Sequence, residues 1–147
     1  MASENPTSTS TANGLLSPGK SRQTSTNGKP RLQVGTRLAA VDVGSNAIRL
    51  VIGELKSNGE IQILKKHREA VRLGKDTFSQ GAISKKCIER TVDTFIKFKG
   101  FLKEQNVKHV RAVATSAMRE ASNSKVLVDA VLQQTGIPIE VIDGLEE

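Results

Sequence analysis

The strongest constraint on the fold is a pair of short apolar runs joined by three turn residues. The runs cover residues 38–43 and 48–55, and Gly44-Ser45-Asn46 joins them. Both runs have the length and the β-branched content of strands, and Gly, Ser and Asn are typical turn formers. The first run is almost continuously apolar, which indicates burial on both faces of a sheet. The pattern therefore predicts a hairpin of two strands that opens the domain.

The turn also carries groups that suit an anion or a metal ion. Asp42 lies where the first run meets the turn, so its carboxylate is either a metal or water ligand or a turn-forming acceptor. Gly44 permits a positive φ and the close approach of a ligand. The amides of Gly44, Ser45 and Asn46 would then form a nest around one anion. The alternative is an ordinary hairpin in which Asp and Asn satisfy their own backbone.

Composition limits the possible partners. The 147 residues allow one domain of ordinary size, and the net charge of +7 fits an anionic ligand as well as a generic basic surface. Trp and Tyr are absent, so the stacking platforms of a single-stranded nucleic-acid binder are missing, and we expect no nucleic-acid partner. No apolar run approaches the ~20 residues that cross a bilayer, so we expect no membrane association. The single cysteine, Cys87, indicates a reducing compartment, and we expect a cytoplasmic protein.

The chain divides into a tail and a folded lobe. Residues 1–36 are dominated by Ser, Thr, Asn, Gly and Pro, which predicts disorder, and residues 37–147 form the lobe. Hydrophobic periodicity and turn signals predict its further elements. In order, these are a strand over 60–69 after the Asn58-Gly59 turn, a loop over 75–81, a helix from Ser84 to about 105, a strand over 107–114, a short helix capped by Thr115 or Ser116, a helix between Asn123 and Gly136, and a strand over 137–142.

Side-chain patterns add detail to this outline. The opening strands are expected to be antiparallel, and the strand after the long helix is expected to return in parallel through a crossover. The long helix carries one apolar stripe that is predicted to pack on the sheet, with Cys87 in a packing role. His67 has no second ligand at metal-binding spacing. The stripe consists of Ile88, Val92, Phe95, Phe98 and Leu102.

Two charged features lie in the second half of the chain. Arg119 falls about one turn inside the short helix, where its planar fork would suit a phosphate. The alternative is a surface arginine that pairs with Glu120 or Glu69. The sequence finishes with Glu146 and Glu147 just past the last predicted strand. Such a carboxylate pair fits an active-site rim or a helix N-terminus, and it equally fits a solvated tail.

Several motifs, in this order and spacing, resemble the N-terminal lobe of the exopolyphosphatase / guanosine pentaphosphate phosphohydrolase family. The resemblance covers residues 38–147. The motifs are Asp42-Val-Gly-Ser-Asn-Ala-Ile-Arg-Leu50, Arg72-Leu-Gly74, Val113-Ala-Thr-Ser-Ala-Met-Arg-Glu-Ala121 with Asn123, and Gly136-Ile-Pro-Ile-Glu-Val-Ile-Asp-Gly-Leu-Glu-Glu147.

The resemblance implies an α/β, ribonuclease-H-like domain of the actin, hexokinase and heat-shock-70 superfamily, with a mixed five-stranded sheet. It implies hydrolysis of a terminal phosphoanhydride bond in inorganic polyphosphate or guanosine pentaphosphate, with Mg²⁺. Gly44, Ser45 and Asn46 match the first phosphate loop, and Arg49 and Arg119 match phosphate-holding arginines. Glu147 matches the general base, Glu146 its neighbour, and Asp42 is the candidate metal ligand.

The resemblance also sets expectations for the whole protein. Full-length members are expected to be homodimers with a second lobe across a cleft. The sequence lacks that lobe and the helix expected after Glu147, so we expect this chain alone to be nearly inactive. Lys85 and Lys86 depart from the family, which more often has acids there. The alternatives are a non-catalytic module that binds phosphate or a polyanion, and a lobe of an actin-like ATPase or sugar kinase.

Overall fold

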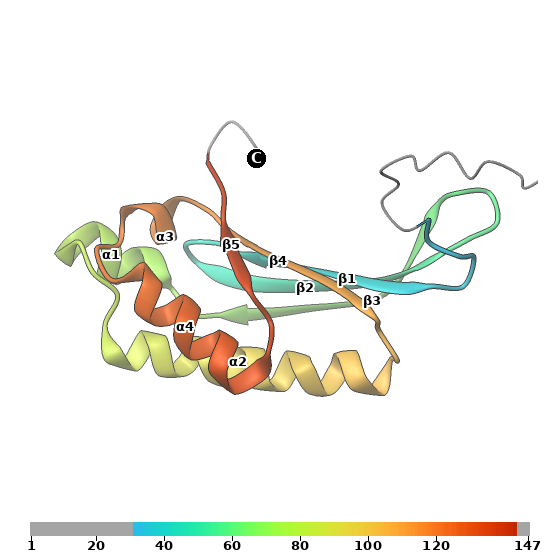
Figure 1. The fold of residues 1–147 in the computed structure, drawn as a ribbon. Coiled ribbons are helices and arrows are strands. Elements are labelled where there is room, and N and C mark those ends of the chain that lie inside the picture. Colours follow the sequence, from blue (N-terminus) through green and yellow to red (C-terminus); the bar gives the residue numbers. More distant parts are fainter. Residues whose placement is uncertain (1–30, 144–147) are drawn as a thin grey trace, which may run out of the picture. The chain divides into compact units, whose positions relative to one another are not determined.

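The computed structural model describes residues 31–143 and contains one mixed sheet with helices (Figure 1). The predicted base Glu147 and its neighbour Glu146 lie outside the described residues. In chain order the elements are β1 (Arg37–Val43), β2 (Ala47–Leu55), β3 (Ile61–Ala70), α1 (Leu73–Gln80), α2 (Lys85–Glu104), β4 (His109–Ala114), α3 (Ser116–Glu120), α4 (Ser124–Thr135) and β5 (Ile139–Val141).

The sheet has the strand order β3-β2-β1-β4-β5. β1, β2 and β3 pair antiparallel, which confirms the predicted opening hairpins. β4 pairs parallel with β1, and β5 pairs parallel with β4, so the chain crosses over through α2 as predicted. A consequence of this topology is that the carboxyl ends of β1, β4 and β5 meet at one edge of the sheet.

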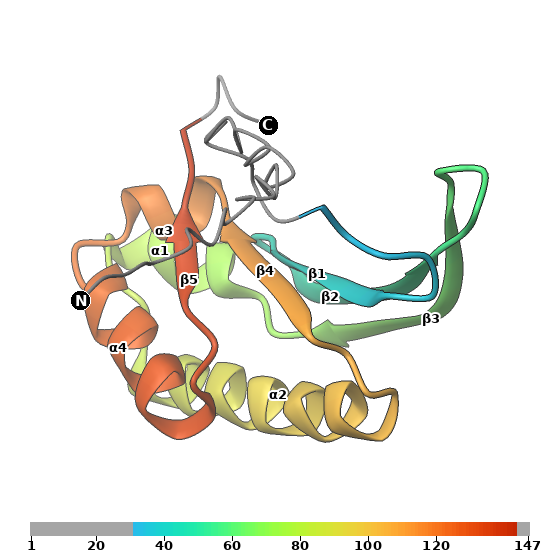
Figure 2. The ribbon, with the colours of Figure 1, turned by 45° about the vertical axis from the view of Figure 1, so that its right-hand side comes forward.

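α2 and α4 lie on one face of the sheet in both views (Figures 1 and 2). Ser84 caps α2, because its Oγ accepts the Cys87 N–H at 3.3 Å, as the sequence predicts. Phe95 and Phe98 of the apolar stripe are fully buried, and Cys87 packs in the same core. Ile88 and Val92 are only partly buried against it. The core thus joins the inner face of β1 and β2 to the two helices.

Helix α1 replaces the predicted loop, and this is the main error of the sequence prediction. The helix begins after Arg72, whose backbone is left-handed with φ 61°. Two hydrogen bonds fix this start: the Arg72 N–H donates to Asn46 O at 3.0 Å, and the Gly74 N–H donates to Ser45 O at 2.7 Å. Both acceptor carbonyls belong to the turn between β1 and β2, which is distant in sequence. Local helix propensity therefore does not reveal this helix.

The ordered structure also starts before residue 37. The segment 33–36 forms a turn, in which the Thr36 N–H donates to Gln33 O and the Gly35 N–H donates to Leu55 O. These bonds extend the β1–β2 hairpin by one turn, which corrects the predicted boundary of the tail. Residues 1–30, for which the sequence predicts disorder, lie outside the described part.

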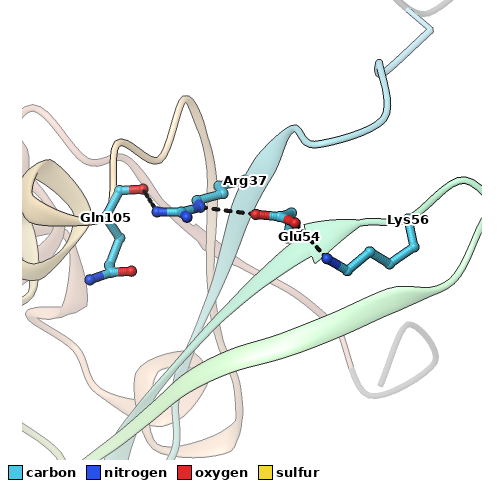
Figure 3. Close-up of polar contacts among 4 residues, drawn as sticks. All are labelled: Arg37, Glu54, Lys56 and Gln105. Atoms are coloured by element: carbon cyan, nitrogen blue, oxygen red, sulfur yellow. Dashed lines mark hydrogen bonds and ion pairs between the residues drawn. The ribbon is translucent and has the colours of Figure 1, made fainter.

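Charged side chains at the amino end of β1 form a small cluster that connects β1, β2 and the end of α2 (Figure 3). Arg37 donates to Glu54 Oε2 at 3.2 Å and to Gln105 O at 2.9 Å, and Lys56 Nζ lies 2.6 Å from Glu54 Oε1. Hydrogen bonds from Lys56 first and Arg37 second lower the pKa of Glu54 from its ordinary value. The cluster therefore binds the sheet to the C-terminus of α2.

Candidate functional site

The carboxyl edge of β1, β4 and β5 brings three segments together. Ser45 Oγ, in the turn after β1, lies 3.2 Å from Ser116 Oγ at the start of α3. Arg119 Nη1 donates to Ile142 O at 2.7 Å, so α3 also contacts the segment that follows β5. Loops beyond the carboxyl ends of parallel strands are where α/β folds place their ligands. The candidate site therefore lies at this edge.

The turn between β1 and β2 presents its backbone in a defined way. The Gly44 N–H donates to Ala47 O at 3.1 Å, so this amide serves the turn itself. The carbonyls of Ser45 and Asn46 accept the hydrogen bonds from the start of α1. Within residues 31–143, the N–H groups of Ser45 and Asn46 have no recorded acceptor. Two of the three predicted nest amides thus remain available to an anion.

Asp42 and Arg49 face each other across the β1–β2 pair. They are register partners, and Arg49 Nη1 lies 3.0 Å from Asp42 Oδ2. Both side chains are about half exposed and project from the sheet face opposite Val41 and Val43. Arg49 Nη1 is 3.8 Å from the position that a Cβ at Gly44 would occupy. The guanidinium therefore lies beside the turn, and the tighter contact of such a Cβ would be with Ala47 O at 3.1 Å.

The predicted helix caps turn out to make tertiary contacts. Thr115 is the N-cap residue of α3 and Asn123 that of α4, but neither side chain makes a capping hydrogen bond. Instead, Asn123 bonds to both backbone groups of Ile83, and Ser116 contacts Ser45. α3 thus contacts the β1–β2 turn through Ser116, for which the sequence predicts only a capping role.

A groove beside the turn was not predicted. It has a volume of about 470 Å³ and runs from Ser45 and Asn46 along the first turns of α1. Arg72 and Lys75 line it together with Phe78, whose side chain is exposed. The sequence signal for this groove was the Arg72-Leu-Gly74 motif, which is part of the family resemblance but has no role predicted from it. The groove places two more cations next to the free amides.

The described residues offer little for a metal ion alone. Between residues 31 and 143 no three His, Cys, Asp or Glu side chains gather in a way that could hold one. Asp42 contributes a single carboxylate, and Arg49 already contacts one of its oxygens. None of the helices in this range combines the length and apolarity that crossing a bilayer requires. The arrangement is therefore best suited to an anion held by amides and guanidinium groups.

The comparison with known sequences identifies the family. The profile of the Ppx/GppA phosphatase family matches residues 51–147. The chain belongs to the Ppx/GppA phosphatase family. Exopolyphosphatase 1 of Mycobacterium leprae is 31% identical over 111 residues, covering 76% of this chain and 33% of the relative. Guanosine-5'-triphosphate,3'-diphosphate pyrophosphatase of Vibrio vulnificus is 33% identical, covering 74% of this chain and 22% of the relative.

Solved structures of Ppx/GppA proteins share the fold. An exopolyphosphatase from Cytophaga hutchinsonii superposes with a TM-score of 0.72 at 38% identity, covering 76% of this chain and 36% of that structure. A Ppx/GppA family member from Aquifex aeolicus gives the same TM-score at 31% identity. These matches confirm the predicted ribonuclease-H-like, actin-like fold. The chain spans about one third of the length of the Mycobacterium leprae exopolyphosphatase.

Proposed function

We propose that this chain forms the phosphate-binding lobe of a phosphohydrolase that cleaves terminal phosphoanhydride bonds of inorganic polyphosphate or guanosine pentaphosphate. The observation that carries the proposal is the turn at the carboxyl edge of the sheet. Its Ser45 and Asn46 amides have no acceptor among residues 31–143, and Arg49 Nη1 lies 3.8 Å from the position of a Cβ at Gly44 in the same turn. Relatives named for both substrates support this reaction class.

In the proposed reaction, the lobe neutralises and orients the terminal phosphate. Phosphoryl transfer requires charge stabilisation and an aligned nucleophile more than covalent catalysis. The amides of Ser45 and Asn46 would bind phosphate oxygens, and Arg49 and Arg119 would contribute bidentate hydrogen bonds. Binding at Arg49 competes with its ion pair to Asp42, which is exposed and therefore weak.

Glu147 is the proposed general base. Its carboxylate would accept a proton from a water molecule in line with the terminal phosphoanhydride bond. The oxygen of that water then bonds to phosphorus, and the shortened chain leaves with its bridging oxygen. Because Glu147 lies outside the described residues, this assignment rests on the match to the family motif.

Mg²⁺ is the proposed cofactor. Magnesium is usually held by one or two carboxylates together with substrate phosphates and water, so the single carboxylate of Asp42 suffices as a protein ligand. When bound, the ion would neutralise charge on the phosphates. For the full-length protein we further propose a homodimer in the cytoplasm.

The test is phosphate release from medium-length polyphosphate with Mg²⁺. It compares this chain with the same chain fused to the part of a relative that follows the matched region. We expect the fusion to release phosphate and Glu147→Gln to abolish release while leaving binding intact. If the fusion binds polyphosphate but neither it nor the chain releases phosphate, the non-catalytic binding module takes the place of the hydrolase. If the fusion instead cleaves ATP, the hypothesis of an actin-like ATPase or sugar kinase lobe is correct.

A further inference from the structure

A second basic cavity lies between α1 and the start of α2. It has a volume of about 240 Å³. Four cationic side chains line it, together with one acid, Asp76. Two of the cations also line the groove that reaches Ser45 and Asn46, so the two hollows adjoin each other at these side chains. The four cations are Arg72, Lys75, Lys86 and Arg90, and the shared ones are Arg72 and Lys75.

The acid in this cavity does not neutralise the cations. Asp76 Oδ2 accepts a short hydrogen bond from Ser84 Oγ and a longer one from the Ser84 N–H at 3.4 Å. Among the described residues, no carboxylate lies within ion-pair distance of Arg72, Lys75 or Lys86. Burial, and then the nearby Asp76, raise the pKa of the Cys87 thiol, which therefore adds no negative charge at neutral pH. The cavity thus keeps a surplus of positive charge.

Two of these cations occupy locally unfavourable positions. Arg72 has a left-handed backbone with φ 61°, a conformation that is unfavourable for a residue with a Cβ. Lys86 lies in the first turn of α2, where the helix dipole disfavours a cation. Glycine at the first position and an acid at the second would be more stable locally. Both residues place a cation at the same cavity in a locally unfavourable position, which indicates that this positive charge has a function.

We propose that this cavity, which we call the α1–α2 basic pocket, binds the distal phosphates of an inorganic polyphosphate chain whose terminal phosphate occupies the β1–β2 turn. The inference rests on the proposed function, because it takes the turn as the terminal-phosphate site. It adds a choice of substrate: a polyphosphate chain continues beyond its first phosphates and can present further ones to the pocket, whereas a guanosine nucleotide continues into its sugar and base. The pocket therefore favours polyphosphate over a guanosine nucleotide.

The test compares the binding of triphosphate and of medium-length polyphosphate to the 147-residue chain by isothermal titration calorimetry without Mg²⁺. The variant Lys86→Gln, at a residue that lines the pocket but not the groove beside the turn, should lose about three- to fivefold in polyphosphate affinity and less than about twofold in triphosphate affinity, since each phosphate contact by an exposed cation is individually modest. Its dependence on salt should also decrease, because fewer counterions are released.

Lys85→Gln is the matched control. Lys85 carries the same charge on the same helical turn as Lys86, but it points to Glu89 at 3.9 Å and does not line the pocket. Its substitution should leave polyphosphate affinity within about twofold of the parent chain. Circular dichroism on each variant verifies that the fold is retained.

The outcomes separate the two proposals. If triphosphate and polyphosphate bind equally tightly per chain, or if Lys85→Gln weakens polyphosphate binding as much as Lys86→Gln, the pocket proposal is overturned while the phosphate-binding turn stands. If an oligonucleotide of equal charge displaces polyphosphate equally well, the pocket is a general polyanion surface and the proposal also fails. If triphosphate does not bind at all, the proposed function fails, and the pocket proposal with it.

Discussion

The two ends of β1 use charge differently. At the amino end, Arg37, Glu54 and Lys56 pair with one another, and Arg37 also binds the end of α2 (Figure 3). At the carboxyl end, Asp42 balances Arg49, but the adjoining groove adds Arg72 and Lys75 without a carboxylate within ion-pair distance in the described part of the chain. Charged groups at the amino end connect structural elements, whereas the carboxyl end has cations that no carboxylate of the described residues pairs with.

This difference indicates how each end responds to substitution. A paired cluster contributes to stability and has nothing to offer an anion, because its donors are already engaged. An unpaired cluster adds repulsion to the folded protein and gains stabilisation only when an anion binds. Substitutions at the amino end should therefore change the free energy of unfolding, and substitutions at the carboxyl end should change phosphate affinity. The predictions below test this separation.

Gly74→Ala should break the separation between the two ends, because it should change both the free energy of unfolding and the phosphate affinity. A Cβ at Gly74 would lie 2.9 Å from Ser45 Cβ and 2.7 Å from Phe78 Cε2. The exposed Phe78 ring can swing away, but Ser45 belongs to the turn. We expect about 1–3 kcal/mol of destabilisation from this overpacking, together with weaker triphosphate binding. Urea unfolding followed by circular dichroism and calorimetric titration measure the two effects.

Gly100→Ala is the control for that substitution. A Cβ at Gly100 would meet no atom within 4 Å, and the residue lies inside α2. Here alanine should stabilise the chain by up to about 1 kcal/mol through helix propensity alone. Equal effects of the two substitutions would contradict the tight contact between α1 and the turn.

Arg49→Gln should sharpen the separation at the carboxyl end. The substitution removes the proposed bidentate phosphate donor, so triphosphate affinity should fall about tenfold. The free energy of unfolding should change by less than about 1 kcal/mol, because the lost ion pair with Asp42 is exposed. Lys125→Gln, which removes an exposed ion pair with Asp129 on α4, is the charge-matched control. A similar loss of affinity in that control would mean that only net charge matters.

Arg37→Leu should give the reverse result at the amino end. It removes the hydrogen bonds to Glu54 and to Gln105 O, and the latter carbonyl lies at the end of α2. We expect about 1–2 kcal/mol of destabilisation and unchanged triphosphate affinity. Lys56→Gln, which removes only one partly buried ion pair, should cost less than about 1 kcal/mol. Loss of phosphate binding in Arg37→Leu would show that the two ends are coupled.

The sheet could be predicted from the sequence because its signals are local. Short apolar runs and the turn residues 44–46 and 58–59 define β1, β2 and β3 to within one or two residues. The capped apolar stripe defines α2 equally well. In each of these cases, hydrophobic periodicity and turn chemistry indicate the same element as tertiary packing does.

The missed features depend on contacts between distant segments. α1 starts at a left-handed Arg72 that is fixed by carbonyls of the first turn, which no local pattern shows. Ser116 and Asn123 had the sequence position of helix caps, yet they serve as bridges to Ser45 and Ile83. The groove along α1 follows from the same contacts. Polar residues near helix starts can therefore be located from the sequence, but their partners cannot.

The smallest predicted effect concerns pH and again belongs to the amino end. Because hydrogen bonds from Lys56 and then Arg37 lower the pKa of Glu54 in the folded chain, its ionised form favours folding. This contribution is complete above the pKa of the unfolded chain and is lost as pH falls through the lower folded pKa. Urea midpoints measured from about pH 6 down to about pH 3 should therefore decline less steeply for Glu54→Gln than for the parent chain. Triphosphate binding at neutral pH should be the same in both chains, because Glu54 lies at the amino end of β1, away from the proposed phosphate site. A parallel decline in the two chains would show that Arg37 and Lys56 remain solvated rather than bound to Glu54.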